Sequence, residues 1–146
     1  MKDAVGGSIL LYLVVIFVSI VIIFFAGIMS YSKAYKIKNR IIEVIERNGT
    51  YEENEVGELT IELKRIGYRT ATIEQIASKC GTESLTYTNN AGHFYCVYIG
   101  EGDKLSGEGY SYEVVTYTHF DFPIIGDLLV LPVKGETKTL GKSYDY

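Results

Sequence analysis

The chain has 146 residues, and 18 acidic against 14 basic side chains give it a formal net charge of -4 at neutral pH. No basic face large enough to neutralise several phosphates is visible, so nucleic acid is excluded as a partner. Without the apolar segment described next, about 100 residues remain, which is enough for one small domain.

Residues 9–29 form an apolar run in which Ser19 is the only clearly polar side chain. As a helix with a rise of about 1.5 Å per residue, this run spans roughly 30 Å, the thickness of the bilayer hydrocarbon core. A single segment in lipid must satisfy its own backbone groups and is therefore helical. A helix buried in a soluble domain is the weaker alternative, because a helix apolar on all sides needs a large protein around it. We predict a transmembrane helix over 9–29, with the lipid bilayer as its partner.

Residues 1–8 precede this run as a short, polar, glycine-bearing segment that resembles a leader. They are too slight for an ordinary secretory signal, since they carry one lysine and the apolar run behind them is longer than a typical signal core. No Ala-x-Ala-like cleavage site follows Met29, so we expect the anchor to stay attached.

Residues 30–48 continue the helix as an amphipathic extension. Apolar side chains recur there at three- and four-residue steps, while lysine, arginine and glutamate take the other faces. The apolar stripe consists of Ala34, Ile37, Ile41, Val44 and Ile45. This half must pack on the following domain or on a neighbouring helix, and Asn48-Gly49 provides its stop.

Residues 49–146 are expected to form an extracellular α+β domain. A second helix is predicted over 55–66, with Asn54 as its cap, Gly67 as its stop and one apolar stripe of Val56, Leu59, Leu63 and Ile66. A third helix is predicted over 73–79, because Thr72 and Gln75 have capping-box spacing.

Strand patterns follow these helices. Residues 85–88 and 93–99 flank a turn at 89–92 and predict a hairpin, followed by a glycine-rich loop over 100–109. A long strand is predicted over 110–122, ended by Pro123. Strands 128–133 and 136–140, separated by Lys134-Gly135, complete the sheet. Helices first and strands after them predict an α+β fold with an antiparallel sheet.

The domain is rich in tyrosine and contains both cysteines. The chain has 13 tyrosines, and six of them crowd between residues 87 and 117, where they favour strands and leave hydroxyls for a polar surface. Cys80 and Cys96 could form a disulfide, which requires an oxidising compartment, or be two small buried hydrophobic residues. We favour the disulfide. No Cys or Cys/His spacing suggests zinc.

Catalytic chemistry has little support in the sequence. His93 and His119 with Asp103, Asp121 and Asp127 could make a small hydrolytic or metal site, and His119 and Asp121 share one strand face. We favour solvent-facing polar residues as the interpretation, because no Gly-x-Ser-x-Gly nucleophile motif is present. The expectation is a protein without enzymatic activity, cofactor or metal.

Two further ligand interpretations are weaker than structural ones. Gly100-Glu101-Gly102-Asp103 lacks the spaced oxygen ligands and terminal glutamate of a calcium loop. The basic residues between Lys33 and Arg40 could touch anionic lipid headgroups, but a solvated helix face is the favoured interpretation.

Several features together resemble the TadE-like minor pseudopilins of tight-adherence (Tad) pilus loci in Gram-positive bacteria. They are the Gly-Gly before the apolar run, the helix that continues into the domain, the segment His119-Phe120-Asp121-Phe122-Pro123-Ile124-Ile125-Gly126-Asp127, and Lys134-Gly135-Glu136-Thr137. The resemblance covers the N-terminal helix and roughly the last quarter of the chain. Residues 49–108 add nothing specific to it. The implied fold is pilin-like.

The resemblance implies processing by a prepilin peptidase after Gly6 or Gly7, and partnership with other pilin-like subunits and a pilus assembly platform. The implied assembly helix contains Ile9, Leu13, Ile16, Phe17, Ile20, Phe24, Ile37 and Ile41. One departure is clear. Pilin-like proteins usually carry a glutamate five residues after the cut, where this chain has Leu11 or Tyr12, and this fits an accessory subunit better than the main one.

Membrane orientation is a point of tension. Lys33, Lys36, Lys38 and Arg40 follow the span while Lys2 precedes it, so the positive-inside rule alone would put the C-terminal domain in the cytoplasm. The resemblance implies the opposite, a single-pass protein with a cytoplasmic N-terminus and an exported domain. The paired cysteines agree with export.

The leading hypothesis is a membrane-anchored, non-enzymatic pseudopilin that takes part in assembly or priming of an extracellular Tad/type IV-like pilus. The alternative is a permanently anchored extracellular binding module with a Tyr-rich sheet. A third hypothesis, a regulatory domain facing the cytoplasm, predicts free thiols.

Overall fold

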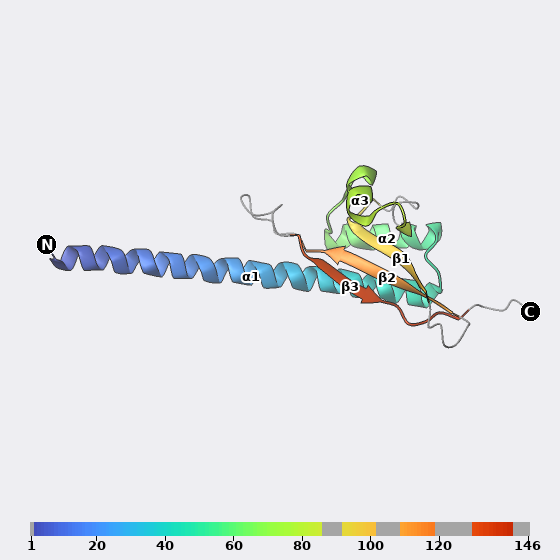
Figure 1. Ribbon diagram of the computed structural model, residues 1–146, viewed down its shortest axis with the longest axis horizontal. Coiled ribbons are helices and arrows are strands. Elements are labelled where there is room, and N and C mark those ends of the chain that lie inside the picture. Colours follow the sequence, from blue (N-terminus) through green and yellow to red (C-terminus); the bar gives the residue numbers. More distant parts are fainter. Residues whose placement is uncertain (1, 86–91, 102–108, 119–129, 142–146) are drawn as a thin grey trace, which may run out of the picture.

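The computed structural model describes residues 2–85, 92–101, 109–118 and 130–141. Figure 1 shows one long helix whose N-terminal half stands alone and whose C-terminal half lies against a small domain of helices and strands. The elements are α1 (Lys2–Asn48), α2 (Glu53–Ile66), α3 (Ile73–Cys80), β1 (Tyr95–Glu101), β2 (Tyr110–Tyr117) and β3 (Pro132–Glu136). This order agrees with the predicted α+β class, a long N-terminal helix followed by an antiparallel sheet.

Helix α1 is a single element of 47 residues, unbroken at Gly27. The leader-like segment 1–8, the span 9–29 and the extension 30–48 are therefore parts of one helix from Lys2 onward. It ends as predicted. Gly49 adopts a φ of 78°, which favours glycine, and its amide donates a hydrogen bond to the Ile45 carbonyl at 2.7 Å.

The three strands form one antiparallel sheet in the order β1-β2-β3. The register pairs Cys96 with Val115, and Val114 with Gly135. Side chains alternate between the two faces, so Tyr112 and Val114 point into the main core while Val115 belongs to a second cluster. Both faces of the central strand are therefore covered.

The main core is built on the amphipathic half of α1. All five residues of the predicted stripe are buried, which confirms the periodicity argument, and the stripe packs on the chain's own domain. The partners of the stripe are Tyr51, Val56, Leu59, Leu63, Tyr68, Tyr95, Val97, Tyr112 and Val114.

Helix α2 begins at Glu53, two residues before the predicted start, so Asn54 lies inside the helix and the prediction of an Asn54 cap is wrong. Val56, Leu59 and Leu63 are buried, but Ile66 is 46 % exposed. The predicted stripe therefore ends one turn early. Ile66 is the last residue of α2, and α2 ends at the edge of the domain nearest the exposed half of α1 (Figure 1).

Helix α3 agrees with the prediction. Thr72 caps it, accepting a hydrogen bond from the Gln75 amide while the Gln75 side chain accepts one from the Thr72 amide. The helix ends at Cys80, followed by Gly81 at a φ of 69°.

Strand β3 corrects the prediction of two strands separated at Lys134-Gly135. It runs through both residues, with Gly135 paired to Val114. Gly135 is needed for close approach, because a Cβ there would lie 2.7 Å from Cδ of Lys38 and 2.9 Å from Cδ1 of Ile42. Leu140, predicted to end a strand, forms only an isolated bridge with Tyr110.

The remaining strand predictions are met in part. β1 begins at Tyr95, and His93 forms an isolated bridge with Thr70 instead of starting the strand. The other strand of the predicted hairpin falls almost wholly on 86–91, outside the described residues. The last four residues of the predicted strand 110–122 also lie outside them.

The described tyrosines between residues 95 and 117 form the predicted polar surface only in part. Tyr95 and Tyr112 lie in the main core. The hydroxyls of Tyr51 and Tyr95 are hydrogen-bonded to each other at 2.9 Å, and Tyr110 donates to the Gly49 carbonyl at 3.1 Å. A phenol ring has a large apolar body with one polar end, so it fills a core wherever that end finds a partner.

We predict that Gly135→Val lowers the free energy of unfolding by about 1–3 kcal/mol, because the new side chain overlaps Lys38 and Ile42 in a packed interface. Urea unfolding of the full chain in detergent micelles, followed by near-ultraviolet circular dichroism of the tyrosines, measures the change. Gly141→Val is the matched control, because nothing lies within 4 Å of a Cβ at that position. Equal stabilities of the two variants would contradict the close approach.

Candidate functional site

The exposed half of α1 is the most unusual surface of the molecule. It contains the one segment in the described residues that is long and apolar enough to cross a membrane. Ser19 donates its hydroxyl hydrogen bond to the Val15 carbonyl at 2.8 Å, so its polar group is satisfied within the helix, as a hydrocarbon environment requires. The exposed predicted assembly residues are Ile9, Leu13, Ile16, Phe17, Ile20 and Phe24.

Two other predicted assembly residues lie elsewhere. Ile37 and Ile41 are fully buried in the main core, where they hold the sheet and cannot contact another subunit. Gly6 and Gly7, the predicted processing positions, lie in the first turns of α1. The continuous apolar surface of α1 that can contact lipid or other helices therefore lies before Ala34.

Helix α2 runs antiparallel to the outer half of α1. Three polar contacts along the pair establish this direction: Lys33 with the Gly67 carbonyl, Arg40 with Glu62, and Arg47 with Glu58. The C-terminal end of α2 is thus brought to within about one helical turn of Met29, the last residue of the apolar run.

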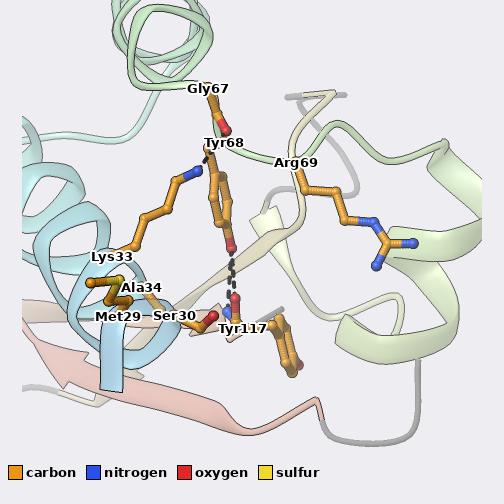
Figure 2. A pocket seen from close by; sticks show the side chains of 8 residues that line it. All are labelled: Met29, Ser30, Lys33, Ala34, Gly67, Tyr68, Arg69 and Tyr117. Carbon is orange, nitrogen blue, oxygen red and sulfur yellow. Dashed lines mark hydrogen bonds between the residues drawn. The ribbon is translucent and has the colours of Figure 1, made fainter. Parts of the chain in front are cut away.

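A cleft of about 460 Å³ opens at this junction. Figure 2 shows how Lys33 reaches up from α1 to Gly67 while Tyr68 points down to Tyr117 of β2. Arg69 extends away from Lys33, and its guanidinium lies 5.8 Å from the ring centre of Phe94. The remaining walls come from Met29, Ser30 and Ala34 of α1. The sequence identified Gly67 only as a helix stop, and nothing in the pattern indicated that its carbonyl would receive Lys33.

Tyr68 fixes the floor of the cleft. Its hydroxyl donates to the Phe94 carbonyl at 2.6 Å and accepts from the Tyr117 amide at 3.3 Å. These bonds join the α2–α3 loop to the residue before β1 and to the end of β2. Burial raises the pKa of Tyr68 to about 12, because the phenolate would lose its hydration.

Most of the basic residues that follow the span are engaged by the domain. Arg40 forms two hydrogen bonds to Glu62 at 2.7 Å and one to Glu43 at 2.7 Å. The hydrogen bond from Arg40 holds the pKa of the Glu62 carboxyl below its ordinary value. Lys38 lies 92 % buried beneath β3, with Nζ 4.3 Å from the ring centre of Tyr35.

The two cysteines form the predicted disulfide. It joins the end of α3 to β1, on the sheet face opposite α1, and both residues are buried. Ile76 and Val115 complete the cluster around it. The disulfide therefore fastens the second, smaller layer of the domain to the sheet.

The residues considered for catalysis or metal binding do not form a site in the described part of the chain. His93 is buried, stacks on Tyr68 with ring centres 6.3 Å apart, and has Nδ1 3.3 Å from the Arg69 carbonyl oxygen. His119, Asp103, Asp121 and Asp127 lie outside the described residues. Among residues that are described, no group of three or more His, Cys, Asp or Glu side chains could hold a metal ion.

Comparison with known proteins gives no match to a protein-family model, to a curated protein or to a solved structure. The functional conclusion therefore depends on the geometry described above: an exposed apolar helix, a domain packed on its continuation, and a cleft where the two meet.

We predict that loss of the disulfide, by reduction or in Cys80→Ala/Cys96→Ala, lowers the free energy of unfolding by about 3 kcal/mol, because it closes a loop with a sequence separation of 16. Urea unfolding in detergent micelles, with and without reductant, measures the loss. The double variant is its own control and should not respond to reductant. Equal stability of the oxidised and reduced wild-type protein would contradict the prediction.

We predict that Tyr68→Phe flattens the alkaline loss of stability. An unfolded tyrosine ionises near its ordinary pKa of 10.0, while folded Tyr68 keeps its proton to about 12. Its stabilising contribution is therefore complete below pH 10 and falls by at most about 1.4 kcal/mol per pH unit as the pH rises toward 12. Unfolding free energies of both proteins between pH 8 and 12 test this. Parallel curves over the whole range would contradict it.

Proposed function

We propose that the chain is a membrane-anchored pilin-like subunit, a pseudopilin that takes part in assembling or priming a Tad/type IV-like pilus at the cell surface. The observation that carries the proposal is that the two halves of α1 have different roles. Its first half is apolar and exposed, and its second half supplies the main core of the domain. The span and the core of the domain thus share one continuous helix, as a subunit lifted by its helix requires.

The mechanism is mechanical. The span remains in the bilayer until an assembly platform lifts it into a bundle of similar helices. Lipid tails are as apolar as the helix surface, so this transfer gains little hydrophobic free energy. Side-chain packing between helices and work supplied by the platform must drive it. Gly6 and Gly7 are the proposed processing positions for a prepilin peptidase.

The proposed orientation has the N-terminus in the cytoplasm and the domain outside. The disulfide supports it, because such bonds persist in oxidising compartments. The basic residues after the span count less toward the positive-inside rule than their number suggests. Lys33 and Arg40 bind groups of the domain, and Lys38 is buried beside Gly135 of β3. Leu11 or Tyr12 at the position of the usual glutamate favours an accessory subunit.

The alternative of a permanently anchored extracellular binding module loses some of its basis. It was inferred from a Tyr-rich polar sheet, whereas Tyr95 and Tyr112 are buried and the hydroxyls of Tyr95 and Tyr110 are hydrogen-bonded within the domain. It still predicts an unprocessed chain that is absent from sheared filaments.

We predict that protein extracted from native membranes has lost Met1 to Gly6 or Gly7, and that its cysteines become alkylated only after reduction. Intact mass spectrometry with and without reduction measures both properties. Replacement of both Gly6 and Gly7 by leucine should leave the full-length mass and remove the chain from sheared filament fractions, whereas the control Gly57→Ala should behave as wild type.

Three outcomes are informative. A full-length mass with a protected disulfide would favour the anchored binding module. A full-length mass with free thiols would overturn export and place the domain in the cytoplasm. Processing without any appearance in sheared filaments would restrict the role to priming at the membrane.

A further inference from the structure

We propose that the end of the domain nearest the span is a docking surface for anionic phospholipid headgroups of the bilayer that holds α1. The surface consists of the cleft with Lys33 and Arg69, and of the last turn of α2 with Lys64 and Arg65. The inference requires only the membrane anchoring of the proposed function, and it names the ligand class of the cleft.

The position of this surface is fixed by the antiparallel pair of helices. The bond from Lys33 Nζ to the Gly67 carbonyl is 3.0 Å long, and Lys33 lies four residues beyond Met29. Four residues of helix amount to about 6 Å. The headgroup region extends roughly 5–7 Å beyond the hydrocarbon core on each side. With the apolar run in the core, the cleft opens at headgroup depth.

Among the described residues, the net charge at this end is opposite in sign to the net charge of the chain. The cleft is lined by two cationic residues, and no carboxylate is among the eight described residues of its wall. The only acidic residue in the second half of α2, Glu62, is bound by Arg40. By contrast, three other glutamates lie at the end of the helix pair farther from the span. Glu43 and Glu46 are near the C-terminus of α1, and Glu58 is in the first half of α2.

Stabilising the C-terminal end of α2 requires only part of the positive charge found there. The C-terminal end of a helix carries about half a negative elementary charge, which one neighbouring cation already balances. Lys33 reaches the Gly67 carbonyl at that end, while Lys64 and Arg65 add two more positive charges in the last turn. A surplus of positive charge remains to face the membrane, where phosphates are the natural partners of lysine and arginine.

Apolar side chains beside these charges fit the same occupant. Ile66 is 46 % exposed at the end of α2, Leu131 is 53 % exposed just before β3, and Tyr31 is 53 % exposed on α1. Exposed apolar residues among cations are typical of surfaces that rest at the membrane interface, and tyrosine favours headgroup depth. This explains why Ile66 departs from the buried stripe of α2.

The experiment uses the absence of tryptophan from the chain. Ile66→Trp places a single fluorophore on the docking surface. Ile99→Trp places one at an even more exposed isoleucine on the part of β1 remote from the span. Each full-length variant is reconstituted in nanodiscs of neutral lipid or of one-third phosphatidylglycerol. Quenching by brominated lipid then reports contact of the tryptophan with the bilayer.

We expect stronger quenching of Ile66→Trp in anionic than in neutral discs, and none of Ile99→Trp in either. In the Ile66→Trp background, Lys64→Gln or Arg65→Gln should lower the ratio of docked to undocked protein about fivefold each in anionic discs. Lys138→Gln, which removes an exposed charge near Glu46, is the matched control and should leave the ratio unchanged.

Equal quenching in neutral and anionic discs, or an equal effect of Lys138→Gln, would overturn the inference. Flotation of the same samples after an alkaline wash separates this failure from that of the proposed function. A chain that does not float with lipid overturns both. A chain that floats without dependence on anionic lipid overturns only the headgroup surface. Docking on anionic lipid, combined with a full-length mass of the protein extracted from native membranes, overturns only the pseudopilin.

Discussion

The packing of the amphipathic half of α1 against the sheet is the interaction on which the rest of the structure depends. A three-stranded sheet is stable only if at least one of its faces is covered. Ile37, Ile41 and Val44 cover the face that carries Tyr95, Val97 and Val114. Because α1 is unbroken from the span into this core, packing also fixes the rotation of the span relative to the domain.

Different forces hold the two layers on the sheet. On the α1 side, β3 lies so close that a Cβ at position 135 would displace the side chains of Lys38 and Ile42, and apolar burial dominates. The ion pairs of Arg40 and Arg47 with α2 are partly exposed and contribute little net free energy, but they fix the direction of α2. On the opposite face, the buried cluster has four members, and two of them are the cysteines whose disulfide links α3 to β1.

The sequence predicted what depends on local periodicity. The stripe of α1, the capping box of α3 and the stop at Gly49 are each encoded within a few neighbouring residues, and all are confirmed. Predictions failed where a distant segment decides the outcome. Gly135 was predicted to separate two strands, but it lies inside β3, next to side chains of α1. Tyrosine hydroxyls were predicted at a polar surface, but those of Tyr95 and Tyr110 are hydrogen-bonded within the domain. The cleft could not be predicted from local sequence either, because it forms where Lys33 meets Gly67, 34 residues further along the chain.

The two proposals are linked by the energetics of leaving the membrane. Transfer of the span from lipid to a helix bundle is nearly neutral in hydrophobic free energy, so it neither holds the subunit in the bilayer nor drives it out. The proposed headgroup contacts at Lys64 and Arg65 would have no equivalent in a bundle of apolar helices. They would therefore retain a waiting subunit and fix the tilt of its domain, and they would break together when the helix is lifted. Because the contacts are electrostatic, retention would depend on the anionic lipid content of the membrane, and the apolar sequence of the span would be left free to serve packing between subunits.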